Sequence, residues 1–212
     1  MPSQLSLKNY YIVSVVMIIL AFLFFCRAYE KRKPQAREIV TIAVLSTIAI
    51  ASRAVFAMLP FFKPMVGIIM ISGMALGAEA GFLIGAVTGF ISNFIFGQGP
   101  WTPWQMFAYG MAGALAGFLG KKGIMKPEKK IRTSIVGYFL VQLVVGPILD
   151  TSSIFVMGNS VRAGYILAVY GAGIIPNAFL GGATFLTLFL GAGSMVEKLQ
   201  RIRKKYGMEE RQ

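Results

Sequence analysis

The sequence contains no histidine and a single cysteine, Cys26, among its 212 residues. A disulfide within the chain and a thiolate metal cluster both need more than one cysteine, so neither can form. Without histidine, a histidine-based catalytic triad, a haem with an axial histidine and histidine-ligated zinc are excluded. We therefore expect no metal, no cofactor and no catalytic residue.

Charged residues are scarce as well. They make up 14% of the chain, whereas 56% of the residues are hydrophobic. A soluble domain carries about 25% charged residues, so there is too little polar material here to cover a water-facing surface. The composition predicts an all-α fold, a polytopic bundle of helices that each cross the bilayer with about 20 apolar residues.

The first apolar segment covers residues 10–26 and is followed directly by a basic run up to Arg37. A secretory signal peptide would end in a small-x-small cleavage site, which is missing, and Phe25 before Cys26 does not fit a lipoprotein signal. The order of apolar segment and basic run favours an uncleaved anchor helix whose amino terminus lies outside.

Six further spans are expected, at about residues 39–59, 65–78, 81–96, 104–119, 134–157 and one more near the end. The last one is either residues 165–190 with a kink or residues 176–196. Because proline is favoured in the first helical turn, we expect it to begin at Pro176, with residues 160–170 as an external segment. The chain then divides into an anchor and linker (1–36), a six-helix membrane domain (37–200) and a basic tail (201–212).

Most of the 21 basic residues fall into three segments, 27–37, 121–132 and 198–211. Seven spans place all three on the same side, and the positive-inside rule assigns that side to the cytoplasm. The amino terminus is therefore predicted outside and the carboxyl terminus inside a cell membrane. Basic loops in this arrangement indicate contact with anionic lipid and not with nucleic acid.

Small residues recur at every fourth position, with glycine on two predicted spans and alanine or threonine on a third. Small-xxx-small spacing lets helix backbones approach closely in lipid. For the glycines we expect packing within the chain. The second kind of stripe, on the first core span, is expected to face another protein, because Ala51 lies about 200° around the helix from Arg53. The glycines are Gly81, Gly85, Gly89, Gly113 and Gly117, and the second stripe is Ala43, Thr47 and Ala51.

Polar residues inside the spans gather in their outer halves. Arg53 and Asp150 lie at similar predicted depth, and charges in hydrocarbon usually find a partner. Either the two form a structural pair that fixes helix register, or they belong to a ligand-binding cluster. The other candidates, which favour the second interpretation although tryptophan also serves as an interfacial belt residue, are Asn93, Gln98, Trp101, Trp104, Gln105, Tyr109 and Asn177.

Residues 51–120 carry a family likeness. They contain Ser52-Arg53-Ala54, Phe62-Lys63-Pro64, Gly77-Ala78-Glu79-Ala80-Gly81-Phe82-Leu83 and Gly97-Gln98-Gly99-Pro100-Trp101-Thr102-Pro103-Trp104-Gln105-Met106. This pattern resembles the substrate-binding (S) components of energy-coupling factor (ECF) vitamin transporters. The last run resembles the branch that handles cobalamin or its precursor α-ribazole.

The resemblance implies six core helices, an outward-facing vitamin site and binding without catalysis. It also implies partners, namely a membrane T component and two cytosolic ATPases. The family's first core helix meets the T component through an Ala-x-x-x-Ala motif, whose nearest match here, Ala43, Thr47 and Ala51, has threonine in the middle. The anchor helix is extra to the six, and the chain has no phosphate-binding loop of its own.

Two other function classes remain open at this stage. An autonomous channel or facilitator would suit the glycine stripes, but the polar residues stop halfway across and no inverted repeat is evident. An intramembrane enzyme would have to rely on Asp150 alone. An S component for a different vitamin is the third alternative.

Overall fold

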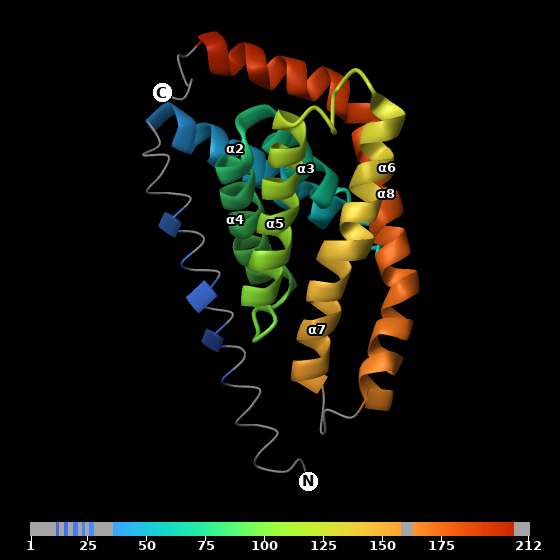
Figure 1. Ribbon diagram of the computed structural model, residues 1–212. Helices are drawn as coiled ribbons and strands as arrows, with labels where there is room; N and C mark the ends of the chain where they lie inside the picture. The colour runs from blue at the N-terminus through green and yellow to red at the C-terminus, as the bar shows by residue number, and fades with distance from the viewer. Residues whose placement is uncertain are drawn as a thin grey trace.

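The computed structural model describes residues 36–157 and 163–205, together with isolated helical positions between residues 12 and 27 (Figure 1). Every regular element in this part of the chain is helical, which confirms the all-α class. The elements are α2 (Ala36–Val55), α3 (Met65–Leu76), α4 (Ala78–Phe96), α5 (Thr102–Lys121), α6 (Lys130–Leu140), η1 (Val141–Val145), α7 (Gly146–Met157) and α8 (Ala163–Lys205). The anchor predicted over residues 10–26 lies largely outside the described residues.

Four described helical stretches are long and apolar enough to cross a membrane. They are Ala36–Val55, Ala78–Phe96, Lys130–Val156 and Ala163–Lys205, and α3 is a shorter apolar helix. We call the end of the bundle with the loop 122–129 the basic end, and the end with the turn 97–101 the turn end (Figure 1). The predicted spans from residue 39 to residue 157 agree with the helices to within a few residues.

The prediction that the last helix begins at Pro176 is wrong. Helix α8 runs for 43 residues from Ala163 to Lys205 with Pro176 inside it, so residues 163–170 are its first turns and not a separate segment. A proline removes one backbone hydrogen bond, but neighbouring helices in a membrane bundle support the chain on both sides of it. The red carboxyl-terminal part of α8 lies across the basic end of the bundle (Figure 1).

The predicted span 134–157 is continuous but changes its helical geometry halfway. A π-helical segment, η1, joins α6 to α7, and the Gly146 N–H bonds the Val141 carbonyl five residues back. Pro147 follows at once, and a proline nitrogen cannot donate to the carbonyl four residues back. The wider turn resolves that conflict, and such turns are frequent near functional positions. Asp150 lies in the next turn of α7.

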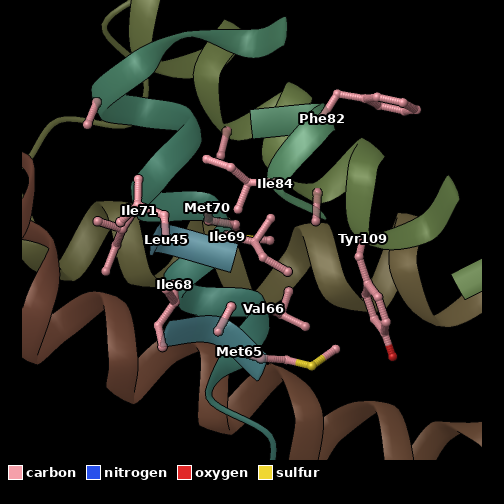
Figure 2. Close-up of a cluster of buried hydrophobic side chains, with 14 of the residues drawn as sticks. Leu45, Met65, Val66, Ile68, Ile69, Met70, Ile71, Phe82, Ile84 and Tyr109 are labelled. Atoms are coloured by element: carbon pink, nitrogen blue, oxygen red, sulfur yellow. The ribbon is translucent and has the colours of Figure 1, made fainter. Parts of the chain in front are cut away.

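The core is built around α3, of which nearly every residue is buried (Figure 2). Helices α4 and α5 approach each other closely because glycines line the contact. A Cβ on Gly81 would strike the Gly113 carbonyl, and one on Gly85 would strike the Tyr109 carbonyl. The predicted packing of this stripe within the chain is confirmed.

Candidate functional site

Arg53, in the last turn of α2, is held against α4 by uncharged groups. Its Nη1 donates hydrogen bonds to Ser92 Oγ at 2.5 Å and to Asn93 Oδ1 at 3.0 Å. The guanidinium also lies 4.5 Å from the centre of the Phe96 ring. Three neighbours on one helix therefore fix the orientation of this half-buried cation.

Asn93 links Arg53 to the turn end through a second hydrogen bond. Its Nδ2 donates to Thr102 Oγ1 at 2.9 Å, and Thr102 in turn donates to Gln98 Oε1 at 2.9 Å. Gln98 is exposed and its Nε2 donates to the Phe90 carbonyl at 3.0 Å, so this side chain folds back onto α4. One hydrogen-bonded chain thus ties α2, α4, the turn 97–101 and α5 together.

Trp101 covers the turn in which it lies. A Cβ on Gly99 would collide with the Trp101 ring, so the indole packs over the backbone at Gly99. Gly97 has a φ of 101°, a conformation that side-chain-bearing residues rarely adopt. The two glycines allow the tight turn that brings Trp101 to the edge of the bundle.

Trp104 points from α5 toward α7 and stacks on Phe155, with ring centroids 5.8 Å apart and planes 20° from parallel. It is only 4% exposed. Within the described part of the chain, Trp104 Nε1 and Gln105 Oε1 are buried without a hydrogen-bond partner. Buried polar groups are normally paired, so this donor and this acceptor on consecutive residues are left available to pair with a ligand.

Tyr109 is buried one turn further along α5. Figure 2 shows its hydroxyl end directed away from Ile69 and Ile84, toward the side on which Met65 begins α3. The positive charge of Arg53 lies within electrostatic range of this hydroxyl. Tyr109 therefore joins the Arg53 side of the bundle.

Asp150 and Asn177 form a separate contact between α7 and α8. Asn177 Nδ2 donates to Asp150 Oδ2 at 2.8 Å. A Cβ on Gly146 would strike the Asn177 amide, and one on Gly173 would strike the Asp150 carboxylate. The pair of Arg53 with Asp150 considered from the sequence is not formed between the two described side chains, because Arg53 is bonded to α4 and Asp150 to α8.

The stripe on α2 lies on the outside of the described bundle. Ala43, Thr47 and Ala51 are all exposed, and Thr47 Oγ1 donates to the Ala43 carbonyl at 2.9 Å. The face is apolar around them, since Val40 and Val44 are exposed too. The small side chains leave space for a partner helix to approach here, and Ala51 lies on the side of α2 turned away from Arg53.

Several residues of the site were missed from the sequence. Ser92 directly precedes the predicted Asn93, and in the sequence only this neighbouring position could have indicated that it belongs to the site. Phe155 is too far along the chain from Trp104 for any local pattern to connect them. Lys63 lies in the loop 56–64, where its Nζ donates to the carbonyls of Phe56 at 3.0 Å, Ala57 at 3.4 Å and Leu59 at 3.3 Å.

An apolar groove of about 620 Å³ lies elsewhere, and none of the predicted site residues lines it. Phe179 and Leu186 in its wall are exposed on α8, so the groove belongs to the outer surface of the bundle. A vitamin needs some polar groups to orient it, which this surface does not supply. Its lining residues are Phe62, Tyr138, Ala178, Phe179, Gly182, Phe185 and Leu186.

Comparison with known proteins gives one match. The model of the family "ECF transporter, substrate-specific component" matches residues 37–192. No curated protein and no solved structure matches the chain. The match covers the described helices from the second residue of α2 to residue 192 of α8, including the Arg53 cluster, the turn 97–101 and the Asp150–Asn177 contact. The chain belongs to the family of substrate-specific components of ECF transporters.

Proposed function

We propose that this chain captures cobalamin or its precursor α-ribazole from outside the cell and delivers it to the rest of an ECF importer. The residues proposed to bind the vitamin lie at the turn end, on α2, α4, α5, α7 and α8. They are Arg53, Asn93, Gln98, Trp101, Trp104, Gln105, Tyr109, Asp150 and Asn177. Gln98 and Asn93 act here by holding the turn and Arg53 in place.

The observation that carries the proposal is the unpaired Trp104 Nε1 and Gln105 Oε1 beside an aromatic stack. A flat heteroaromatic ring can pack against Trp104 or Phe155, and its polar atoms can pair the buried donor and acceptor. Cobalamin and α-ribazole both contain a benzimidazole. The run from Gln98 to Gln105, which resembles the cobalamin branch, contributes both of these residues.

The chain is a multi-pass membrane protein of a family of transporter subunits, which is not a family of enzymes. Substrate-specific components of this family sit in the lipid bilayer and work with a T component and ATPases. In this chain we assign the T component contact to Ala43, Thr47 and Ala51. Their exposure on α2 supports that assignment, since a small face allows a partner helix to approach closely.

Purified protein in detergent, titrated with cobalamin, α-ribazole, riboflavin, thiamine and biotin, tests the substrate. We expect tight binding of cobalamin or α-ribazole, and no tight binding of riboflavin, thiamine or biotin. Trp104→Ala should weaken that binding by about 1–3 kcal/mol, roughly tenfold to a hundredfold, as for other bases stacked on aromatic side chains. The matched control is Phe94→Ala, which removes an exposed ring from α4 and should leave affinity unchanged.

Binding of another vitamin only, or equal affinity in wild type and Trp104→Ala, would contradict the proposed substrate site. Uptake into liposomes that contain this chain alone, without a T component or ATPases, would favour the facilitator instead.

The orientation is tested by labelling single cysteines in a Cys26→Ser background in whole cells. A cysteine at Pro100, which is exposed, should react with an impermeant maleimide from outside. One at Lys126 should react only after the cells are opened. The reverse pattern would place the turn end in the cytoplasm and remove the outward-facing site.

A further inference from the structure

Arg53 has hydrogen-bonding capacity that no described residue uses. Both of its hydrogen bonds leave from Nη1, to Ser92 and Asn93, and Phe96 covers one face of the guanidinium. The Nε–H and Nη2–H groups are left without a described partner. They form the planar edge with which arginine binds carboxylate or phosphate through two parallel hydrogen bonds.

A second cation, Lys63, acts on Arg53 through its charge. It directs its ammonium at three carbonyls in the loop that follows α2. Burial lowers the pKa of Lys63, and the charge of Arg53 lowers it further. The two side chains are therefore near enough for each to raise the positive potential at the other.

No described carboxylate neutralises these two cations. Asp150, the described carboxylate nearest the turn end, is bonded to Asn177 on the other side of the bundle. The carbonyl end of α2 supplies only about half a negative charge. A charge in a low-dielectric setting is costly until it meets its counterion. The remaining described carboxylates are those of Glu38, Glu79, Glu128 and Glu197 in the first turns of α2 and α4, the loop before α6 and the late part of α8.

We propose that the free edge of Arg53, supported by the field of Lys63, binds a phosphate group of the transported molecule. The ligand is then a phosphate-bearing form of the vitamin or precursor. Ser92, Asn93 and Phe96 hold the guanidinium in position, so little side-chain entropy is lost when the phosphate binds. The N–H groups of Lys63 already donate to the loop carbonyls, so Lys63 contributes only its positive charge to phosphate binding. This inference rests on the proposed function, because it names the part of the same ligand that Arg53 recognises.

The test compares pairs of ligands that differ by one phosphate. One pair is α-ribazole and α-ribazole 5′-phosphate, and the other is cobinamide and cobinamide phosphate. Calorimetry on wild-type protein should show that the phosphorylated member of a pair binds about tenfold to a hundredfold more tightly, as expected for hydrogen bonds to a charged group.

Arg53→Met should remove this preference, so that both members of a pair bind with equal affinity, and its melting temperature shows whether the variant is folded. Arg53→Lys keeps the charge but loses the planar edge, so it should retain part of the preference. Lys122→Met is the matched control. It too removes a cation that lies 4.5 Å from an aromatic ring, that of Phe118 at the basic end, and it should leave the preference intact.

Equal affinity for both members of a pair in the wild type would overturn the inference while the proposed substrate class stood. So would a preference that survives in Arg53→Met. If no member of either pair bound while cobalamin did, the inference would fail and the proposed substrate would stand. If cobalamin did not bind either, both would fail.

Discussion

Helices α2 and α4 each carry a stripe of small residues at every fourth position, yet the two stripes have different surroundings. On α4, Gly81 and Gly85 lie against the backbone of α5, where an added Cβ would strike a carbonyl. On α2, Ala43 and Ala51 are exposed. The spacing therefore produces a smooth helix face in both cases, but it does not say whether the neighbour belongs to the same chain.

The surroundings differ because α4 is packed on several sides and α2 is not. Helix α4 lies against α3, α5 and α2. Of the 18 residues in its apolar stretch 61% are buried, whereas only 22% of the corresponding stretch of α2 is buried. A smooth face inside the bundle is filled by the next helix of the fold. A smooth face on a peripheral helix is available to a partner, and we assign this one to the T component.

The largest effect is expected where the small residue meets backbone. Gly85→Ala places a methyl group against the Tyr109 carbonyl, and α5 cannot move aside without losing its other contacts. We expect a loss of stability of about 3 kcal/mol or more, at the upper end of the cost of overpacking. Denaturation in mixed detergent micelles measures it.

Gly171→Ala is the control, since nothing lies within 4 Å of a Cβ added at that position. It should change stability by less than about 1 kcal/mol, in the direction of helix propensity. Equal stability of Gly85→Ala and Gly171→Ala would contradict the close contact between α4 and α5, because the added methyl group would then fit beside the Tyr109 carbonyl.

The second effect is on transport and not on folding. Ala51→Trp or Ala43→Trp should abolish vitamin uptake in cells that also produce the T component and ATPases, because a large ring keeps the partner helix away. Binding by the purified variant and its melting temperature should be unchanged, since the stripe faces away from Arg53 and the core.

Ala172→Trp makes the same change at an exposed position of α8 and should leave uptake intact. A well-folded Ala51→Trp protein that fails to bind the vitamin would show that this face of α2 belongs to the ligand site.

The smallest effect is expected where a glycine meets a movable side chain. A methyl group at Gly173 would strike the Asp150 carboxylate, which can rotate away at the cost of its hydrogen bond to Asn177. Gly173→Ala should therefore cost no more than about 1.5–3 kcal/mol, the value of one hydrogen bond to a charged group. The melting temperatures of Gly173→Ala and Gly85→Ala are compared in the same detergent. An equal decrease in both would mean that the Asp150 side chain cannot rotate away from the added methyl group.

The candidate site was only partly visible in the sequence. The depth of Arg53 and Asp150 along their helices could be counted from the span boundaries, and the run from Gln98 to Gln105 marked the turn end. The hydrogen-bond partners of Arg53 and Asp150 could not be predicted, because the sequence of a helix does not show which other helix packs beside it. Arg53 accordingly bonds Ser92 and Asn93, and not the charge of opposite sign at similar depth.

The last helix shows a different limit. Pro176 at the edge of an apolar run predicts a helix start, since proline fits a first turn and costs a hydrogen bond elsewhere. That cost is small beside the burial of Gly173, Asn177 and Leu180 against the rest of the bundle. The local preference was outweighed by packing on both sides of the proline.

The sequence by itself determined the class of the protein. Scarcity of charge and repeated apolar segments leave few folds other than a helical membrane bundle, because unpaired backbone in lipid is too costly. The tertiary structure alone decided which small stripe is buried, which groups hold Arg53, and that Trp104 meets Phe155. These depend on contacts between residues far apart in the chain, and such contacts follow from how all the helices pack together.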